Sequence, residues 1–305
     1  MEKRQIGRLA VSVTGVGCNN FGRRLDAERT AKVVHAAVDA GINFFDTADT
    51  YGKTRSEEFL GKALGKKRKD VIIATKFGMA IDEERKGARP EYVRSAAEDS
   101  LRRLGTDYID LYQLHTPDET VPIADTLGAL DELVKAGKVR EIGCSNFSVE
   151  QLAEADQAAK PRAAKFVSVQ NEYSLFHRAS AQPVLAECAT LGIAFLPYFP
   201  LANGLLTGKY RKGQPPPEGS RIASGWHGEL LTEENLDKVE KLIEFSEGRG
   251  HTILELAFSW LLSRPMVASV IAGATTPEQV VANAAAGEWD LTESELEEVS
   301  RIVPA

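Results

Sequence analysis

The sequence predicts a single α/β domain over residues 1–305, folded as a (β/α)8 TIM barrel. Two observations carry this prediction. Short apolar runs alternate with longer amphipathic segments, which is the pattern of a parallel sheet with crossover helices. Successive strand ends, apart from the interval before the last strand, are also near-regular, about 26 to 39 residues apart, as in βα units. No Pro/Ser linker or change of composition divides the chain, which favours one barrel over a doubly wound sheet with a second domain.

Eight of the apolar runs are strand-like. Most lack strict alternation, which is typical of strands covered on both faces, as the inner strands of a barrel are. In chain order they are Val13–Gly17, Ile42–Phe45, Val71–Ala74, Ile109–Leu114, Val139–Cys144, Phe166–Val169, Ile193–Leu196 and Val267–Ile271.

Helix start and stop signals lie between these runs. Proline begins and glycine ends a helical pattern in the segments Pro90–Gly105 and Pro122–Gly137. Thr54–Glu57 fits a capping box that would begin another helix. Before the last run the chain is longer, with Pro215–Pro217 followed by extra helical sequence at Thr232–Gly248. A connection of this length predicts a binding lid.

Composition excludes several classes of protein. The chain is 43% hydrophobic and 27% charged, which is ordinary globular usage. Its net charge is 37 − 44 = −7 without a basic tract, so a nucleic-acid partner is not expected. The longest uncharged run, Cys188–Gly208, is broken by Pro197 and Pro200, so no membrane span is predicted.

The first residues and the cysteines indicate the compartment. Met1–Val13 has no apolar signal-peptide core, so the cytoplasm is expected. The three cysteines lack CxxC spacing, which argues against a disulfide framework and a structural zinc site. No metal site is predicted, and the sequence leaves the oligomeric state open.

Gly15-Val16-Gly17 is a poor dinucleotide fingerprint. A GxGxxG motif would need glycine where Asn20 stands, and no acidic residue follows at the expected distance after a clear second strand. The Rossmann interpretation is therefore weak.

Polar residues stand where the predicted strands end. Asp46, Lys76 and His115 end the second, third and fourth runs, and Tyr51 follows closely after the second. In a (β/α)8 barrel these carboxyl ends converge on one mouth. Taken singly, the four have structural alternatives: a helix cap, a snorkelling surface cation, a hydrogen-bonded core histidine and a half-buried packing ring.

Together the four residues could act as a general acid, with Tyr51 as the proton donor. An ammonium at Lys76 would lower the pKa of Tyr51 from about 10 towards the working range, and Asp46 would keep the lysine charged. His115 could then donate a hydrogen bond to a carbonyl oxygen or help relay a proton. Such a site suits carbonyl reduction.

A family resemblance begins at these residues. The segments NFFDTADTYG, ATKFG, DLYQLH, GCSNF, VQNEYSLF and PYFPLANGLLTGKY, in this order, resemble the aldo-keto reductase superfamily over almost the whole chain. They are most similar to the branch with potassium-channel β subunits and bacterial general reductases. The resemblance implies the same barrel, with a β-hairpin at Arg4–Val13 over its bottom. It also implies Asp46, Tyr51, Lys76 and His115 as catalytic residues, with Tyr51 as the general acid.

Hydride must come from a cofactor, because no side chain donates one. The resemblance implies NADPH, with NADH less favoured. Ser145, Asn146 and Gln170 would hold the carboxamide, Tyr198 would stack on the nicotinamide, and Lys209 with Arg221 would approach the phosphates. The full set of implied contacts is Gly17, Asp46, Ser145, Asn146, Gln170, Tyr198, Phe199, Pro200, Leu201, Lys209, Arg221, Gly273, Thr275, Gln279 and Asn283.

The sequence departs from the family pattern at several of these places. Phe199 stands where many members have serine, Gln279 where others have arginine, and Ala282 where close relatives have glutamate. Binding of a 2′-phosphate would therefore depend on the loop cations and backbone donors. Cys18-Asn19 also replaces a frequent Thr-Trp pair beside the substrate pocket.

The favoured hypothesis is NADPH-dependent reduction of an aldehyde or ketone, a small-molecule substrate. Two alternatives stay open. The chain could be an NADP(H)-binding regulatory or sensor subunit with little turnover, or a dehydrogenase of an alcohol or sugar. The pocket loops contribute Met79 and Trp226 as candidate apolar walls.

Overall fold

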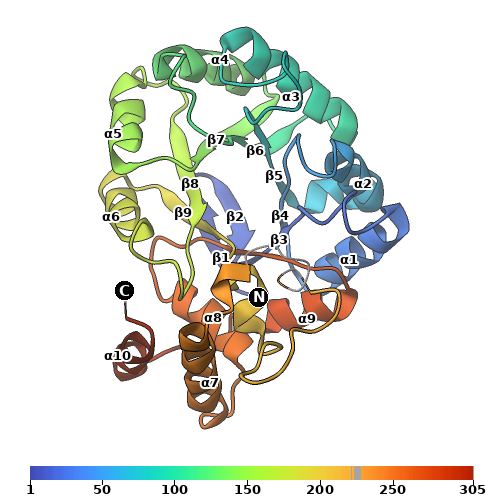
Figure 1. The fold of residues 1–305 in the computed structure, drawn as a ribbon. Helices are drawn as coiled ribbons and strands as arrows, with labels where there is room; N and C mark the ends of the chain where they lie inside the picture. Colours follow the sequence, from blue (N-terminus) through green and yellow to red (C-terminus); the bar gives the residue numbers. More distant parts are fainter. Residues whose placement is uncertain (221, 223–227, 305) are drawn as a thin grey trace.

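A computed structural model of the protein describes residues 1–220, 222 and 228–304. Eight parallel strands form a nearly closed barrel surrounded by helices (Figure 1). The order around the barrel is β10-β3-β4-β5-β6-β7-β8-β9. These strands are β3 (Thr14–Gly17), β4 (Phe44–Asp46), β5 (Ile72–Phe77), β6 (Ile109–Leu114), β7 (Val139–Ser145), β8 (Phe166–Glu172), β9 (Ala194–Tyr198) and β10 (Val270–Gly273).

All eight predicted strands are present, with shifted ends. The predicted runs stop at the last apolar residue, whereas β4, β5 and β8 continue to Asp46, Phe77 and Glu172. The barrel closes through the segment before β10, because the Phe195 amide donates to the Met266 carbonyl oxygen at 2.7 Å.

The helices lie outside the barrel (Figure 1). The α-helices are α1 (Ala27–Asp39), α2 (Arg55–Leu64), α3 (Pro90–Leu104), α4 (Ile123–Lys135), α5 (Val149–Ala158), α6 (Ala181–Leu191), α7 (Glu233–Glu247), α8 (Ile253–Leu262), α9 (Pro277–Ala285) and α10 (Glu293–Ile302). Short 3-10 helices are η1 (Gly65–Asp70), η2 (Ala202–Thr207) and η3 (Gly228–Leu230).

Helix α3 shows why proline and glycine mark the predicted start and end of a helix. Pro90 fits the first turn because its missing N–H has no intrahelical partner there, and Gly105 ends the helix in the left-handed region at φ 65°. Val93 and Leu104 are buried against the barrel. In the same way, the predicted helical segment 232–248 forms α7.

The predicted capping box at Thr54 is wrong. Helix α2 begins at Arg55, but Thr54 is left-handed at φ 72° and its side chain makes no capping hydrogen bond. Glu57 instead points into the protein and is fully buried. The loop that carries Tyr51 sets the course of the chain into this helix and overrides the local capping preference.

An antiparallel hairpin of β1 (Lys3–Ile6) and β2 (Leu9–Ser12) covers the amino-terminal end of the barrel, as the resemblance implied. Ile6 and Val11 are fully buried in a core cluster with Leu111 and other barrel residues. The hairpin is held to β7 by Glu141, whose carboxylate accepts from the Arg8 amide at 3.0 Å. The opposite end of the barrel stays open to a cleft.

Candidate active site

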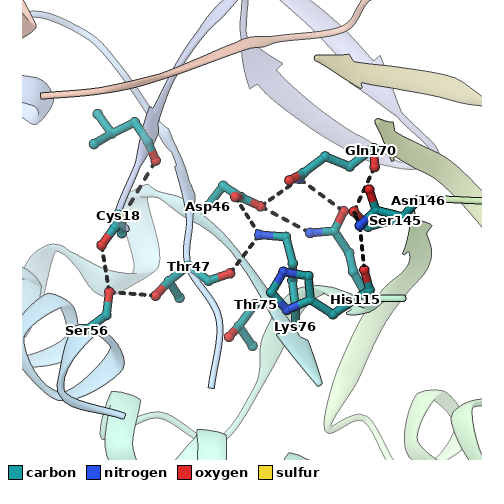
Figure 2. A network of polar contacts seen from close by, with 12 residues as sticks. Cys18, Asp46, Thr47, Ser56, Thr75, Lys76, His115, Ser145, Asn146 and Gln170 are labelled. Atoms are coloured by element: carbon teal, nitrogen blue, oxygen red, sulfur yellow. Dashed lines mark hydrogen bonds and ion pairs between the residues drawn. The ribbon is translucent and has the colours of Figure 1, made fainter. Parts of the chain in front are cut away.

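Asp46 and Lys76 form a buried ion pair at the carboxyl ends of neighbouring strands. Lys76 Nζ lies 2.6 Å from Asp46 Oδ2 and donates to the Thr47 carbonyl oxygen at 2.9 Å (Figure 2). Burial lowers the pKa of Lys76, but the neighbouring Asp46 and Tyr51 outweigh it and the pKa is raised. The lysine is therefore a permanent cation inside the barrel mouth.

Tyr51 lies over this ion pair. Its ring centroid is 5.2 Å from Lys76 Nζ and 5.8 Å from the His115 ring, which meets it edge-on at 77°. Burial raises the pKa of the Tyr51 phenol, and the Lys76 charge only partly offsets that rise. The predicted net lowering of this pKa is thus wrong in direction, because desolvation of the phenolate is stronger than the attraction of the ammonium.

His115 is a neutral imidazole. Burial, reinforced by Lys76, lowers its pKa to about 3. A neutral ring has one N–H to donate, so at physiological pH His115 is a hydrogen-bond donor and not a cation. Its backbone is fixed from two sides: the amide donates to Phe77 O at 2.8 Å, and its carbonyl oxygen accepts from Asn146 Nδ2 at 2.9 Å.

A pair of amide side chains holds the other oxygen of Asp46. Gln113 Nε2 and Gln170 Nε2 donate to Asp46 Oδ1 at 3.1 and 2.9 Å, and Gln170 also approaches Gln113 Oε1 at 3.5 Å. With its nitrogen used in this way, Gln170 keeps its side-chain oxygen as an acceptor. Gln113 was not among the predicted site residues. Its signal was a polar residue inside an apolar run, two positions before His115 and therefore on the same strand face.

Ser145, Asn146 and Tyr198 form a second polar group beside this network (Figure 2 shows the first two). Ser145 Oγ donates to Gln170 O at 2.7 Å, and the Tyr198 hydroxyl donates to Asn146 Oδ1 at 2.9 Å. Asn146 is left-handed at φ 62°, a conformation that asparagine tolerates better than most residues. The ends of β7 and β9 therefore bring these three side chains together, and the Gln170 backbone of β8 holds Ser145.

One cleft of about 1270 Å³ contains these groups. Tyr51, His115, Asp46 and Met79 line it, while Lys76 lies behind them, fully buried. Arg221 and Trp226 lie outside the described residues. Every other residue implied for the cofactor lines this cleft: Gly17, Asp46, Ser145, Asn146, Gln170, Tyr198, Phe199, Pro200, Leu201, Lys209, Gly273, Thr275, Gln279 and Asn283.

The far end of the cleft is the amino terminus of α9. Thr276 caps the helix, and Gln279 Oε1 turns back to accept from the Thr275 amide at 2.8 Å and its hydroxyl at 3.1 Å. Ala282 lines the cleft without adding a charge. The free N–H groups and positive dipole end of a helix start favour an anion such as a phosphate.

A buried acidic cluster supports the Tyr51 loop from behind. Glu57 accepts from Thr75 Oγ1 and from Arg103 Nε, both at 2.6 Å. Asp49 is also fully buried, yet among the described residues neither of its carboxylate oxygens has a hydrogen-bond partner in ordinary geometry. Burial and the nearby Glu57 raise the pKa of Asp49 to about 7, against smaller opposing effects of Arg103, Thr50 and Tyr92.

The cysteines and the possible metal ligands add no further candidate site among the described residues. All three cysteines are buried and free, and burial raises the pKa of Cys18 well above its usual value, which suppresses its thiolate. Within the described residues no His/Cys/Asp/Glu group has the geometry to hold a metal ion. None of the described helices combines the length and apolar character that crossing a bilayer requires.

Comparison with known proteins shows which family has this fold and this arrangement of residues. The Aldo/keto reductase family model matches residues 14–304. The chain belongs to this family. It is therefore an enzyme, an NAD(P)H-dependent oxidoreductase, and the barrel with its hairpin is the fold of this family.

Similar proteins of the family carry different names. This aldo/keto reductase is 37% identical over 307 residues to probable aldo-keto reductase 1 of Glycine max, covering 96% of this chain and 86% of that one. It is 34% identical over 296 residues to a probable voltage-gated potassium channel subunit beta of Oryza sativa subsp. japonica, covering 93% and 90%. It is 33% identical over 308 residues to aldo-keto reductase YhdN of Bacillus subtilis (strain 168), covering 98% and 90%.

A solved structure is also similar. The glycerol dehydrogenase AKR11B4 from Gluconobacter oxydans superimposes with a TM-score of 0.86 at 30% sequence identity, covering 99% of this aldo/keto reductase and 94% of that chain.

Proposed function

We propose that this protein reduces an aldehyde or ketone to an alcohol with NADPH, using Tyr51 as the general acid. The observation that carries the proposal is the position of Tyr51, which lies over a permanently charged Lys76 and beside a neutral His115 in one cleft. These three groups surround a point at which a carbonyl oxygen could be protonated.

The residues of the cleft fit a nicotinamide dinucleotide. Gln170 offers a side-chain oxygen to a carboxamide, because Asp46 and Gln113 engage its nitrogen. The ring of Tyr198 lines the same wall, and the start of α9 offers a place for a phosphate. When bound, NADPH would supply the hydride. Preference for NADPH over NADH would come from Lys209 and Arg221.

The side chains divide the proton chemistry among them. Tyr51 gives its hydroxyl proton to the carbonyl oxygen as negative charge develops there. Lys76 stabilises the phenolate that remains, which matters because burial by itself opposes ionisation of Tyr51. His115, neutral because its pKa is about 3, donates its ring N–H to the same oxygen and fixes the orientation of the substrate.

The test of the proposal is Tyr51→Phe. Turnover of an aromatic aldehyde should fall at least about a hundredfold, the scale of a lost general acid, while quenching of protein fluorescence by NADPH is retained. Circular dichroism and the melting temperature of the variant report whether it folds. Turnover equal to that of the parent would refute the role of Tyr51.

A dehydrogenase is the second candidate, favoured by the similarity to a glycerol dehydrogenase. Rates measured in both directions at pH 7 and pH 9 separate the two, since alcohol oxidation releases a proton and gains from high pH. Binding of NADPH without repeated turnover of any carbonyl would instead favour a regulatory subunit, the kind of protein that the rice relative is named as.

A further inference from the structure

Cationic side chains gather on the rim of the cleft beside Tyr51. The β3–α1 loop contributes Arg23 and Arg24, the β4–α2 loop contributes Lys53, and Arg55 is the first residue of α2. Among the described lining residues the carboxylates are Asp46, which is bound to Lys76, and Glu218. A chain of net charge −7 thus concentrates positive charge at its mouth, where it would attract an anion.

Lys53 and Arg55 have no carboxylate partner among residues 1–220, 222 and 228–304. Arg55 Nε donates to the Gly52 carbonyl oxygen at 3.0 Å, and this neutral acceptor leaves its charge uncompensated. The two rim cations are therefore available to a ligand.

The backbone holds Lys53 in an unusual conformation. Gly52, Lys53 and Thr54 are all left-handed, at φ 60°, 56° and 72°. Glycine adopts this region readily, but lysine and threonine are strained there. The loop is locked from the other side, because a Cβ on Gly52 would lie 2.3 Å from the Phe21 carbonyl oxygen.

Strained non-glycine residues persist where the surrounding structure enforces them, and they concentrate at functional sites. Here the strained residue Lys53 lines the cleft, two residues from Tyr51. The candidate dinucleotide residues, apart from Gly17 and Asp46, come from β7 to α9 and the loop after β9. The β4–α2 loop thus belongs to the substrate side of the cleft.

We propose that Lys53 and Arg55, with Arg23 on the facing loop, bind an anionic group of the substrate. The substrate class is then an aldehyde or ketone that carries a carboxylate or a phosphate. Because the reacting carbonyl is the one assigned to Tyr51 above, this inference rests on the proposed function. The rim binds one end of the molecule and the tyrosine protonates the other.

The experiment compares matched neutral and anionic carbonyls. Kinetics are measured with 4-carboxybenzaldehyde and its methyl ester, and with glyceraldehyde 3-phosphate and glyceraldehyde. The parent enzyme should show a KM roughly tenfold lower for the anion of at least one pair, the scale of a charge-assisted hydrogen bond, and added salt should reduce this advantage. The pair with the larger difference identifies the carboxylate or the phosphate.

Variants locate the effect. Lys53→Met should raise KM for the preferred anionic substrate at least about fivefold more than KM for the matched neutral substrate. Lys53→Arg keeps the charge, so its KM for the anionic substrate should equal that of the parent. Lys53→Gly removes the charge and the backbone strain together, so it should resemble Lys53→Met if the charge is what acts. Lys62→Met, on the exposed face of α2 away from the cleft, changes net charge equally and should match the parent.

Several results would overturn the inference. Equal KM values within both pairs would do so, as would a loss of NADPH affinity in Lys53→Met by fluorescence quenching, which would assign the cation to the cofactor. Should no carbonyl be turned over, the proposed function fails, and the rim is tested by calorimetry without turnover. In that case 4-(hydroxymethyl)benzoate should bind the NADP+ complex of the parent about tenfold tighter than that of Lys53→Met, and equal affinity would end the proposal.

Discussion

Replacing Asp49 by asparagine should remove a pH-dependent loss of stability. The pKa of Asp49 is raised in the folded protein from 3.8 to about 7, first by burial and then by Glu57. The unfolded chain is ionised above about pH 4, whereas the folded protein keeps the proton up to about pH 7. The folded state therefore binds one proton more in this window, and stability falls as pH rises through it.

The size of this loss follows from the shift. At 1.36 kcal/mol per pKa unit, the difference between 3.8 and about 7 is worth about 4 kcal/mol above pH 7. Asparagine does not titrate, so Asp49→Asn should gain about 3 kcal/mol relative to the parent between pH 4.5 and pH 8, because the unfolded parent is already largely ionised at pH 4.5. Changes of packing at the site cancel, because they are present at both pH values.

Urea unfolding at pH 4.5 and pH 8, followed by circular dichroism, measures the effect. The free energy of unfolding of the parent should fall more steeply with pH than that of Asp49→Asn. Asp107→Asn, which removes an exposed carboxylate, controls for the change in net charge. Identical pH dependence in the parent and Asp49→Asn would refute a buried, unpartnered carboxyl at this position.

Three further substitutions test other contacts. Gln113→Leu removes a donor at 3.1 Å from Asp46 Oδ1, so kcat/KM should fall about 10- to 100-fold in a protein that circular dichroism shows to be folded, and parent-like kinetics would argue against the amide pair. Gly61→Ala should destabilise the protein by about 1–3 kcal/mol in urea unfolding, because its Cβ would lie 2.1 Å from Leu104 O where α2 meets α3. Gly128→Ala, in α4 with open space around it, should instead stabilise by about 0.5–1 kcal/mol, so the same sign in both variants would contradict the packing argument.

The barrel could be predicted because each of its strands is a short apolar run in the sequence. A strand that is covered on both faces needs apolar residues at nearly every position, so the pattern is easy to recognise. The pattern placed the strand ends poorly. Asp46 and Lys76 look like the first residues of a loop, but in the structure Asp46 is the last residue of β4 and Lys76 lies within β5. Residues that pair with each other across neighbouring strands can be buried although each alone is polar.

Other predictions failed for the same reason. Tertiary contacts, which local sequence patterns do not show, determine the start of α2, the pKa of Tyr51 and the role of Gln113. The capping box at Thr54 failed because the loop beside Gly52 packs on Phe21. The pKa of Tyr51 was predicted from its cation alone, while the degree of burial that dominates it is not visible in a sequence. Gln113 was missed because its partner Asp46 lies 67 residues away in the sequence, and a lone amide in an apolar run does not identify that partner.

The proposed chemistry is split along the polypeptide. Asp46, Tyr51, Lys76, His115 and the rim cations all come from the first 115 residues, whereas the strand ends and loops assigned to the dinucleotide come almost wholly from the remainder. An engineer could therefore exchange the two short loops at 19–24 and 52–55 for those of another family member. Such a graft would redirect what the enzyme accepts and leave its coenzyme untouched.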